Sequence, residues 1–254
     1  MLPGLKWFSV KEVIVKTWTV WIVAFLGVAS MVVEAKPPTS MTVDMTWNFE
    51  VDADGHVTRL DTSDKRVPSL HDRLEKEIRG WHFRPGQVNG QPATTESKLY
   101  VSLDLESKGG DMYAVRVAGV STGGGYDKIV TPNYPETALA ARRQGVVVLK
   151  VRYAENGRVI SVVPYEDGPQ ADASLVRAAI GAVKKWTFEP EIVDGHPMMN
   201  DVLVPVCFEL GQAGVPHANC DWKKPGITIG MATDHAVALD PAAKLLTDVI
   251  GRTL

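Results

Sequence analysis

Two stretches of the chain share one pattern of residues at a constant separation. The first, "GWHFRPGQVNGQP", begins at Gly80, and the second, "KWTFEPEIVDGHP", begins at Lys185. Five residues recur 105 positions apart, in the pairs Trp81 and Trp186, Phe83 and Phe188, Pro85 and Pro190, Gly90 and Gly195, and Pro92 and Pro197. A fixed offset of this kind indicates a repeated structural unit, so we expect the fold to contain one small unit twice.

The first unit is predicted to span residues 36–106. Apolar and polar residues alternate strictly between residues 42 and 52, which predicts a strand with one apolar face. The turn "DADG" leads into a second strand, a helix with one apolar stripe follows, and a last strand closes the unit. The predicted inward-facing residues are Val43, Met45, Trp47, Phe49 and Val51 of the first strand, Leu70, Leu74, Ile78 and Trp81 of the helix, and Leu99, Val101, Leu103 and Leu105 of the last strand.

The second unit, residues 129–211, repeats this order. Its hairpin turns at Asn156-Gly157, its helix opens near Asp172, and an added short helix with Pro135 in its first turn comes before the first strand. Its inward-facing residues are Leu175, Ala179, Val183 and Trp186 of the helix, and Val202, Val204, Val206, Phe208 and Leu210 of the last strand. We therefore predict the α+β class: two units of strand, strand, helix and strand, each with a helix over a short antiparallel sheet.

Residues 1–35 form a separate N-terminal segment. Lys6, Lys11 and Lys16 precede the uncharged stretch Thr17–Val33. As a helix this stretch would be about 26 Å long, close to the roughly 30 Å hydrocarbon core of a bilayer. It is predicted to be an apolar helix, either a cleaved signal peptide or an inner-membrane anchor, and both interpretations stay open. In both cases the lysines keep the N-terminus in the cytoplasm and the remainder lies in the periplasm.

Two further segments lie outside the repeated units. Residues 107–128 contain two glycine clusters around the apolar stretch Met112–Val120, which favours a flexible linker over an added strand. Residues 212–254 form a C-terminal tail. Asp240 and Pro241 predict the start of a short helix in this tail, and its apolar face is expected to pack on the second unit.

The chain contains two cysteines, Cys207 and Cys220. Export places them in an oxidising compartment, where a disulfide persists. The competing interpretation is a metal site that also uses His217 or His235, but the spacing of these residues matches no common ligand pattern. We therefore predict a Cys207–Cys220 disulfide and no metal site.

Composition and motifs argue against two classes of function. Lys and Arg total 27 against 30 Asp and Glu, a formal net charge of −3, so no nucleic-acid partner is expected. The stretch "TGGGYD" lacks the lysine of a phosphate-binding loop, and no H-E-x-x-H motif is present. We therefore predict that the protein is not an enzyme and uses no cofactor.

Several of these segments resemble a known family. "PNYPETA" at residues 132–138, "GVVVLKVRYAENGRV" at residues 145–159, "KWTFEP", "DGHP" and "VLVPVCFEL" together resemble the C-terminal domain of TonB proteins, the energy transducers of Gram-negative outer-membrane uptake. The resemblance covers about Val130 to Leu210. Residues 41–105 resemble a degenerate second copy that lacks the Tyr-Pro element.

The resemblance implies a binding function. In TonB C-terminal domains the Ton box, an extended segment of an outer-membrane transporter, adds as a strand to the exposed edge of the last strand, and the segment leading into Tyr-Pro lies nearby. Transferred to this chain, this implies strand addition at an unsatisfied edge, where Pro205 is tolerated because proline lacks an N–H. The implied partner-binding residues are Thr131, Pro132 and Tyr134 together with Asn200, Asp201, Val202, Leu203, Val204, Pro205 and Val206.

A second hypothesis stays open beside the energy transducer. TonB-like transducers usually carry a histidine in the membrane helix, for coupling to ExbB and ExbD, and a long proline-rich rod. Thr17–Val33 contains no histidine, and only Lys36–Ser40 separates it from the first strand. The alternative is a periplasmic scaffold with TonB-like domains that is not coupled to ExbB and ExbD, and in which the units pair with each other or the chain forms a homodimer.

Overall fold

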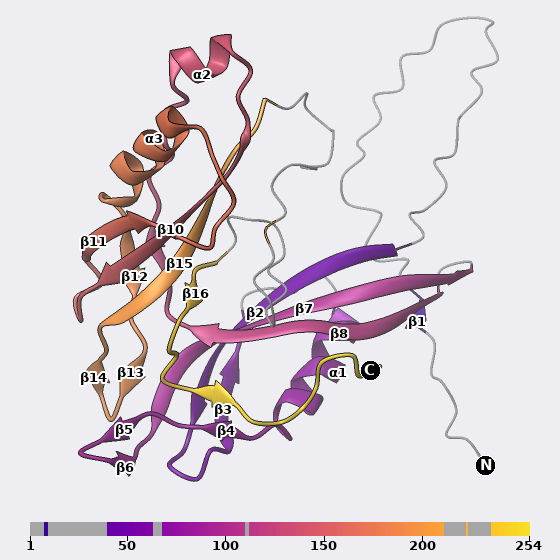
Figure 1. Ribbon diagram of the computed structural model, residues 1–254. Coiled ribbons are helices and arrows are strands. Elements are labelled where there is room, and N and C mark those ends of the chain that lie inside the picture. Colours follow the sequence, from indigo (N-terminus) through magenta and orange to yellow (C-terminus); the bar gives the residue numbers. More distant parts are fainter. Residues whose placement is uncertain (1–7, 10–39, 63–67, 110–111, 211–221, 223–234) are drawn as a thin grey trace, which may run out of the picture.

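The computed structural model describes residues 8–9, 40–62, 68–109, 112–210, 222 and 235–254. Two main antiparallel sheets dominate this part of the chain, a larger one next to α1 and a smaller one next to α2 and α3 (Figure 1). The predicted apolar helix at Thr17–Val33 lies outside the described residues. Within them, no helix has the length and hydropathy needed to cross a membrane.

The larger sheet is built on two long strands, β2 (Ser40–Val51) and β7 (Thr95–Gly109), which form an antiparallel pair. The second edge of β2 pairs with β3 (Val57–Asp61), and the second edge of β7 pairs with β8 (Met112–Gly123). Buried and more exposed side chains alternate along the second half of β2, which confirms the predicted period-two strand.

The first hydrophobic core lies between this sheet and α1 (Pro68–Ile78). Every residue predicted to face inward in this unit is buried, except Val43, which is half-buried at the margin of the core. Two residues from the C-terminal end of the chain, Ala243 and Val249, complete the core. The apolar stripe of α1 therefore packs as expected, and the tail adds to it.

The smaller sheet has β10 (Gly145–Tyr153) between β11 (Val159–Pro164) and β15 (Asn200–Phe208). One face is covered by α3 (Ala173–Val183), which begins next to Asp172 as predicted, and the Asp172 side chain caps its first turn. The predicted inward-facing residues of this unit are buried, except Leu210, which follows the end of β15 and is half-buried. They form a second core beneath α3.

The remaining described elements are short. They are β1 (Phe8–Ser9), β4 (Phe83–Arg84), β5 (Gln87–Val88), β6 (Gln91–Pro92), β9 (Gly125–Lys128), α2 (Glu136–Ala140), β12 (Thr187–Glu189), β13 (Ile192–Val193), β14 (His196–Pro197), β16 (Val237–Ala238) and β17 (Lys244–Leu245). Most of them pair with segments distant in sequence: β1 with β8, β4 with β17, β9 with β12, β13 with β7, and β16 with β15. The added helix α2 ends at Ala140, and the chain turns at Arg142, which has a φ of +49°.

In each of the two predicted units, the tip of the hairpin is hydrogen-bonded to the segment that follows the helix. The N–H of Phe83 donates to the carbonyl oxygen of Gly55 at 2.9 Å, and the N–H of Phe188 donates to that of Gly157 at 2.9 Å. Both glycines have positive φ, and a Cβ at either would overlap the carbonyl oxygen of the same phenylalanine. Glycine is therefore required at each tip for close backbone approach.

The prediction of a flexible linker at residues 107–128 is wrong for most of its length. Residues 112–123 form β8, and Tyr113, Val115 and Val117 alternate into the first core. The second glycine cluster, Gly123 to Gly125, is a site of close packing instead. A Cβ at Gly124, for example, would overlap the carbonyl oxygen of Glu189.

The predicted helix after Asp240 is also wrong. The described part of the tail runs extended, with β16 on the smaller sheet and β17 on β4. Its side chains reach both cores, since Ala236 and Ala238 lie in the second core while Ala243 and Val249 lie in the first. Pairing with existing strand edges outweighs helix formation because a helix this short is marginal in water.

Candidate functional site

The residues Asn200 to Val206, predicted to bind a partner, all lie on β15. One edge of this strand pairs with β10 along its whole length, from Asn200 opposite Tyr153 to Phe208 opposite Gly145. We call the other edge, which faces away from β10, the outer edge. It lies beside the C-terminal segment that contains β16 (Figure 1).

The outer edge is partly occupied by the chain itself. Val237 lies opposite Leu203, Ala238 lies opposite Val202, and the N–H of Leu239 donates to the carbonyl oxygen of Asp201 at 2.9 Å. The expectation of an unsatisfied edge is therefore wrong for residues 201–203. The reason is that no strand was expected in the tail, whereas residues 237–238 form one on this edge.

Pro205 explains why this pairing ends at Leu203. In an antiparallel ladder, the N–H and C=O of one residue point to the same neighbour, and successive residues alternate between neighbours. Because the carbonyl of Asp201 faces Leu239, the backbone groups of Leu203 and Pro205 also face the outer edge. Pro205 has no N–H, so the ladder cannot continue past Leu203 in the same way.

The side chains of β15 are enclosed on both faces. Val202, Val204 and Val206 are buried in the second core. On the opposite face, Leu203 is buried in a third apolar cluster with Val146, Val148, Trp222 and Val237. The sequence pattern did not predict this second covered face. The outer edge therefore offers main-chain groups to a partner rather than side chains.

The first two residues of β15 are held by polar neighbours. Arg152 donates two hydrogen bonds to the carboxylate of Asp201, at 2.6 and 2.8 Å, and these bonds are the main reason that the pKa of Asp201 lies below its usual value. The side-chain amide of Asn200 donates to the carboxylate of Glu191 at 3.1 Å and to the carbonyl of Asp240 at 3.2 Å. These side chains therefore fix the start of β15 and its contact with the tail.

The predicted flanking residues Thr131, Pro132 and Tyr134 precede α2 in a segment without regular secondary structure. The ring of Tyr134 meets the ring of Phe208 edge-on, with centroids 5.5 Å apart, at the far end of β15. Thr131 and Pro132 line a cavity against α3. Among the described contacts, only Tyr134 of the three touches β15, and it does so away from the residues that pair with β16.

The cysteine prediction is only partly covered by the structure. Cys207 lies on β15 opposite Val146, and it is not a free thiol. Cys220 and His217 lie outside the described residues, so the Cys207–Cys220 disulfide stays a prediction.

His235 anchors the segment that enters β16, a role that no local sequence pattern indicates. Its ring stacks on Tyr100 with centroids 4.2 Å apart, and its Nε2 lies 3.4 Å from the hydroxyl oxygen of Ser121. The residue is 4% exposed, and burial lowers its pKa to about 4. The imidazole is therefore neutral at pH 7 and packs the tail against β8.

Glu191 is a second anchor that the repeat pattern does not predict, because its counterpart in the first unit is Gly86. It is 1% exposed. Its carboxylate accepts hydrogen bonds from the hydroxyl of Ser97 at 2.7 Å, from Asn200, and from the N–H of Ala242 at 2.9 Å. Burial raises the pKa of Glu191. This acid joins β7, β15 and the tail through donors from all three.

Ser121 lies in a G-x-S-x-G pattern, Gly119–Gly123, that bears on the prediction of no enzyme activity. The pattern marks a nucleophilic serine when it forms a sharp turn between a strand and a helix. In this protein it lies within β8, which runs extended beside β7. Among the described hydrogen bonds, no carboxylate orients His235, so the third member of a catalytic triad is missing from them. The Ser121–His235 contact joins the tail to β8.

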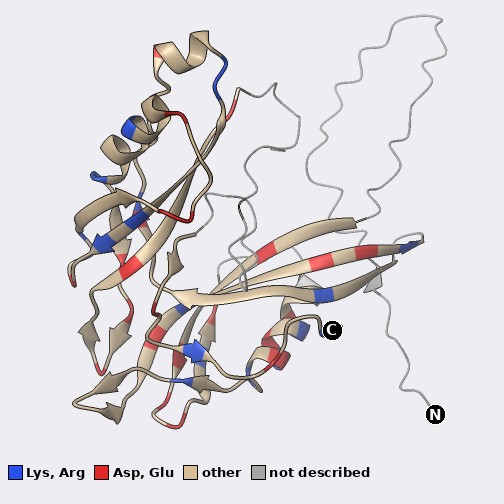
Figure 2. Cartoon of the chain, in the orientation of Figure 1, with Lys and Arg blue, Asp and Glu red and all other residues tan. Residues whose placement is uncertain are grey.

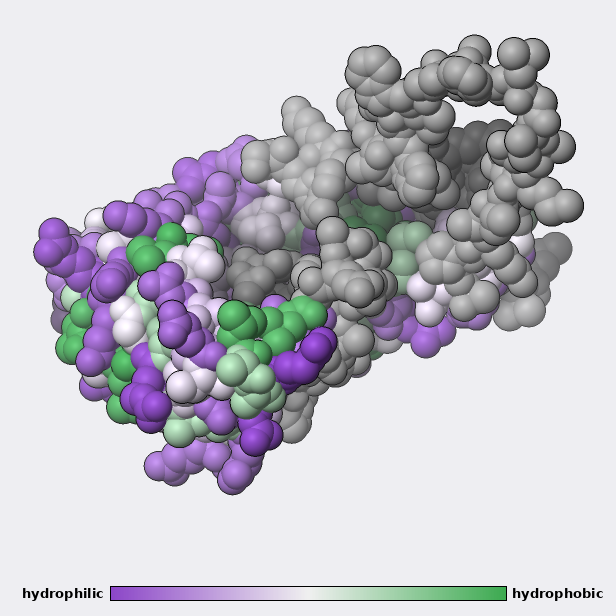
Figure 3. Space-filling view, turned by 90° about the horizontal axis from the view of Figure 1, so that it is seen from above, coloured by the Kyte–Doolittle hydropathy of each residue, from purple (hydrophilic) through white to green (hydrophobic). Residues whose placement is uncertain are grey.

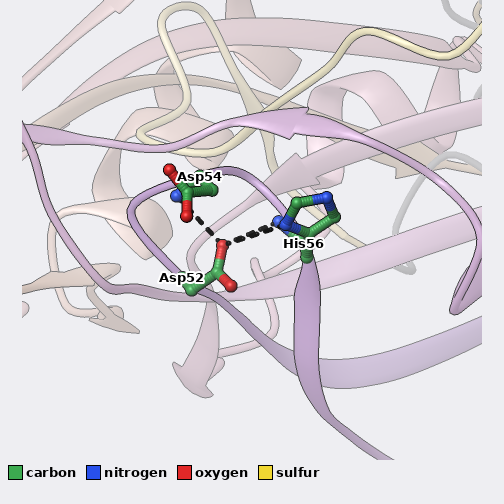
Figure 4. A group of neighbouring side chains, drawn as sticks. All are labelled: Asp52, Asp54 and His56. Atoms are coloured by element: carbon green, nitrogen blue, oxygen red, sulfur yellow. Dashed lines mark hydrogen bonds and ion pairs between the residues drawn. The ribbon is translucent and has the colours of Figure 1, made fainter.

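A cluster of possible metal ligands occurs at the tip of the β2–β3 hairpin. Asp52, Asp54 and His56 place one ligand atom each within 4.8 Å of one another (Figure 4). The Asp52 carboxylate accepts the backbone N–H groups of Asp54 at 3.0 Å and of His56 at 2.9 Å. The bond from His56 is the main reason that the pKa of Asp52 is lowered. An Asx turn, which stabilises the hairpin, accounts for this cluster.

The described surface shows no single chemical character. Lys and Arg are interspersed with Asp and Glu over both sheets (Figure 2). On the face seen from α2 and α3, apolar residues form small groups among hydrophilic ones (Figure 3). In these two views, charges of both signs are mixed and the apolar groups are small.

Comparisons with known proteins match about a third of the chain. Residues 130–210 match the family described as Gram-negative bacterial TonB protein C-terminal. A Protein TonB from Xanthomonas campestris pv. campestris (strain B100) is 39% identical over 79 residues, which are 31% of this chain and 34% of that protein. A Protein TonB from Vibrio cholerae serotype O1 is 29% identical over 82 residues, 32% of each chain. The chain thus spans about a third of the length of these relatives, and no solved structure matches it.

Proposed function

Since residues 130–210 belong to the family of TonB C-terminal domains, we propose that this protein binds an extended segment of another protein by adding it as a strand to the outer edge of β15. The observation that carries this proposal is the pairing of Leu203 with Val237. It shows that the outer edge takes up an antiparallel strand through its main chain. Strand addition requires outward-facing N–H and C=O groups, as at Asp201 and Leu203.

The larger sheet supports the proposal from a second direction. In our two-unit interpretation, residues 36–106 are a degenerate copy of the domain, and β7 is the counterpart of β15. The edge of β7 that corresponds to the outer edge of β15 is filled by β8, an antiparallel strand that pairs from Lys98 to Gly109. One copy therefore carries a full-length added strand within the same chain, while the other carries only the two residues of β16.

We propose the Ton box of an outer-membrane transporter as the bound segment, with the protein acting in the periplasm as an energy transducer. The support for this partner is the similarity of residues 130–210 to proteins named TonB. Thr17–Val33 would either anchor the chain in the inner membrane or be removed on export. Coupling to ExbB and ExbD requires the anchored form, because a released protein cannot transmit force from the inner membrane.

Two substitutions at Leu203 test whether the partner is bound through the main chain or through the side chain of this residue. Leu203→Pro removes the N–H that faces the outer edge, whereas Leu203→Ala keeps it, and both remove the buried side chain. We expect Leu203→Pro to lower the affinity of the full chain for a synthetic Ton-box peptide at least tenfold more than Leu203→Ala does, measured by fluorescence anisotropy. Equal affinities of the two variants would contradict strand addition at this position.

A photo-crosslinking residue locates the bound strand. Leu203 and Val163 lie in one row across the smaller sheet, since both pair with Lys150 from opposite sides. We expect the peptide to crosslink to a photoreactive residue at position 203 and not to one at position 163. Crosslinking at position 163 alone, or at neither position, would exclude the outer edge of β15 as the site.

A periplasmic scaffold that is not coupled to ExbB and ExbD is the second candidate. The pairing of β15 with β16 favours it, because an edge that is filled internally needs no guest strand. The two candidates differ in their effect on iron uptake. Deletion of the gene should impair growth on chelated iron if the protein is a transducer, and should leave that growth unchanged if it is a scaffold.

A further inference from the structure

The segment that occupies the outer edge of β15 has a regular pattern of side chains. Val237 is fully buried on the face that it shares with Leu203 and Trp222, where its neighbours are mainly aliphatic. Ala236 and Ala238 lie on the opposite face, in the second core. The strand on this edge therefore presents one aliphatic residue between two small ones.

The small side chain of Ala238 is required by the close approach of β8. A Cβ added at Gly123 would lie 2.7 Å from the Cβ of Ala238, so the two chains already pack at close range. Ala236 is equally enclosed, with 1% of its surface exposed. A longer side chain in place of Ala238 would clash with the backbone of β8. The third apolar cluster, which contains Val237, accommodates a branched side chain.

We propose that residues 236–238 occupy the place of the partner strand. The outer edge of β15 then selects an extended segment with a small, an aliphatic and a small residue in succession, and that segment must displace the tail in order to bind. This inference rests on the proposed function, to which it adds a sequence pattern for the partner and a competition within the chain.

The competition follows from the tethering of the tail. A segment held beside its site by the same chain acts at an effective concentration on the order of millimolar. The tail is also fixed on both sides of β16, by the stacking of His235 on Tyr100 and by the hydrogen bond of Ala242 to Glu191. A free segment with the same contacts must therefore bind the intact chain much more weakly than a chain whose tail has been released.

The first experiment uses the chain's own segment as the probe. The peptide TDHAVALDP has the sequence of residues 233–241. Val237→Asp places a charge in the aliphatic cluster and should release the tail of the full chain. Leu246→Asp is the matched control, because Leu246 lies further along the tail and is 56% exposed. We expect the peptide to bind the Val237→Asp variant at least tenfold more tightly than it binds the unaltered chain or the control.

Equal affinity of the peptide for all three proteins would overturn the competition. Two altered peptides test the pattern on the Val237→Asp variant. One has Asp in place of its valine, and the other has Leu in place of its second alanine. We expect both to bind at least tenfold more weakly than the parent peptide, and undiminished binding of both would overturn the pattern.

A measurement on the unaltered chain does not depend on the folding of a variant. His235 has a pKa of about 4 while it is stacked on Tyr100, so displacement of the tail should return its pKa toward 6.5. An NMR titration of His235 at a saturating concentration of the Ton-box peptide measures this change in pKa. If a Ton-box peptide crosslinks at position 203 while the pKa of His235 stays low, the inference fails and the proposed function stands. If no peptide crosslinks there in any variant, the proposed function fails as well.

Discussion

The hydroxyl of Ser97 donates a hydrogen bond of 2.7 Å to the carboxylate of Glu191 in the interior of the protein. Ser97 lies on β7, and Glu191 lies between β12 and β13. The N–H of Ala242 in the tail donates to the same carboxylate at 2.9 Å. One buried acid therefore holds the larger sheet, the second unit and the tail together, and the tail in turn lies on the outer edge of β15.

Removal of the Glu191 carboxylate should destabilise the folded protein. Glu191→Ala leaves the N–H of Ala242 and the amide of Asn200 without their buried acceptor, so we expect the free energy of unfolding to fall by roughly 2–4 kcal/mol. Urea denaturation of the full chain measures it. Glu166→Ala, at an exposed position, should change the free energy of unfolding by less than about 0.5 kcal/mol. Equal effects of the two substitutions would contradict a linking role for Glu191.

His235 should make stability depend on pH. Burial lowers its pKa in the folded chain from 6.5 to about 4, so the unfolded chain binds the proton more readily. The contribution of neutral His235 to the free energy of unfolding is therefore fully present above about pH 6.5 and is lost as the pH falls toward 4. Between pH 7 and pH 4.5 the loss amounts to about 2–3 kcal/mol.

The comparison of two histidine variants isolates this contribution from that of the acids. His235→Phe keeps an aromatic ring on Tyr100 and removes the titrating group, so it should lose less stability between pH 7 and pH 4.5 than the unaltered chain. His196→Phe, at an exposed position, should behave as the unaltered chain does. Urea denaturation at the two pH values provides the measurement, and parallel losses in both variants would rule out a buried neutral His235.

Substitutions at Gly157, in the hairpin tip of the second unit, and at Gly195 distinguish the effect of backbone strain from that of steric overlap. Gly157 and Gly195 have nearly equal φ values, 75° and 76°, but only at Gly157 would a Cβ overlap the carbonyl of Phe188. Gly195→Ala should therefore lower the free energy of unfolding by about 1 kcal/mol through backbone strain alone. Gly157→Ala should lower it by about 3 kcal/mol or more, and denaturation experiments on both variants measure the difference. Similar losses would mean that the tip can move away from Phe188.

The residues of the two main cores could be predicted because their signals are local. The alternation in β2 and the apolar stripe of α1 involve residues that are close in sequence, and Trp47 and Leu74 are buried as those patterns indicate. The same holds for α3, whose start near Asp172 and inward residues were predicted. A local pattern predicts which face of a helix or strand is buried, even when the element that packs against that face is not known.

The candidate site could be predicted only in part, because its occupant is distant in sequence. The strand β15 was expected, but the pairing of Val237 with Leu203 depends on an edge that no local pattern in the tail indicates. Gly123 suggested flexibility and is instead small because Ala238 packs against it. Glu191 stands where the first unit has Gly86, so the repeat itself concealed its role.

The two repeated tryptophans provide a last comparison. The indole N–H of Trp186 donates to the carbonyl oxygen of Val130 at 2.7 Å and so ties the end of α3 to the segment that contains Thr131 and Pro132. Trp186→Phe keeps an aromatic ring and removes this bond, so we expect the free energy of unfolding to fall by about 1–2 kcal/mol. Amide exchange of residues 130–135 should also accelerate, and Trp81→Phe, its counterpart in the first unit, should leave that exchange unchanged. Unaltered exchange in Trp186→Phe would show that the bond does not hold the segment.

The same variant tests whether this flanking segment belongs to the proposed binding site. Loosening residues 130–135 should weaken binding of the Ton-box peptide several-fold if Thr131 and Pro132 contact the guest, because the guest must then order them again on binding. They line a cavity against α3 and not the part of β15 that pairs with β16. Faster exchange together with unchanged affinity in Trp186→Phe would therefore confine recognition to β15 and remove both residues from the site.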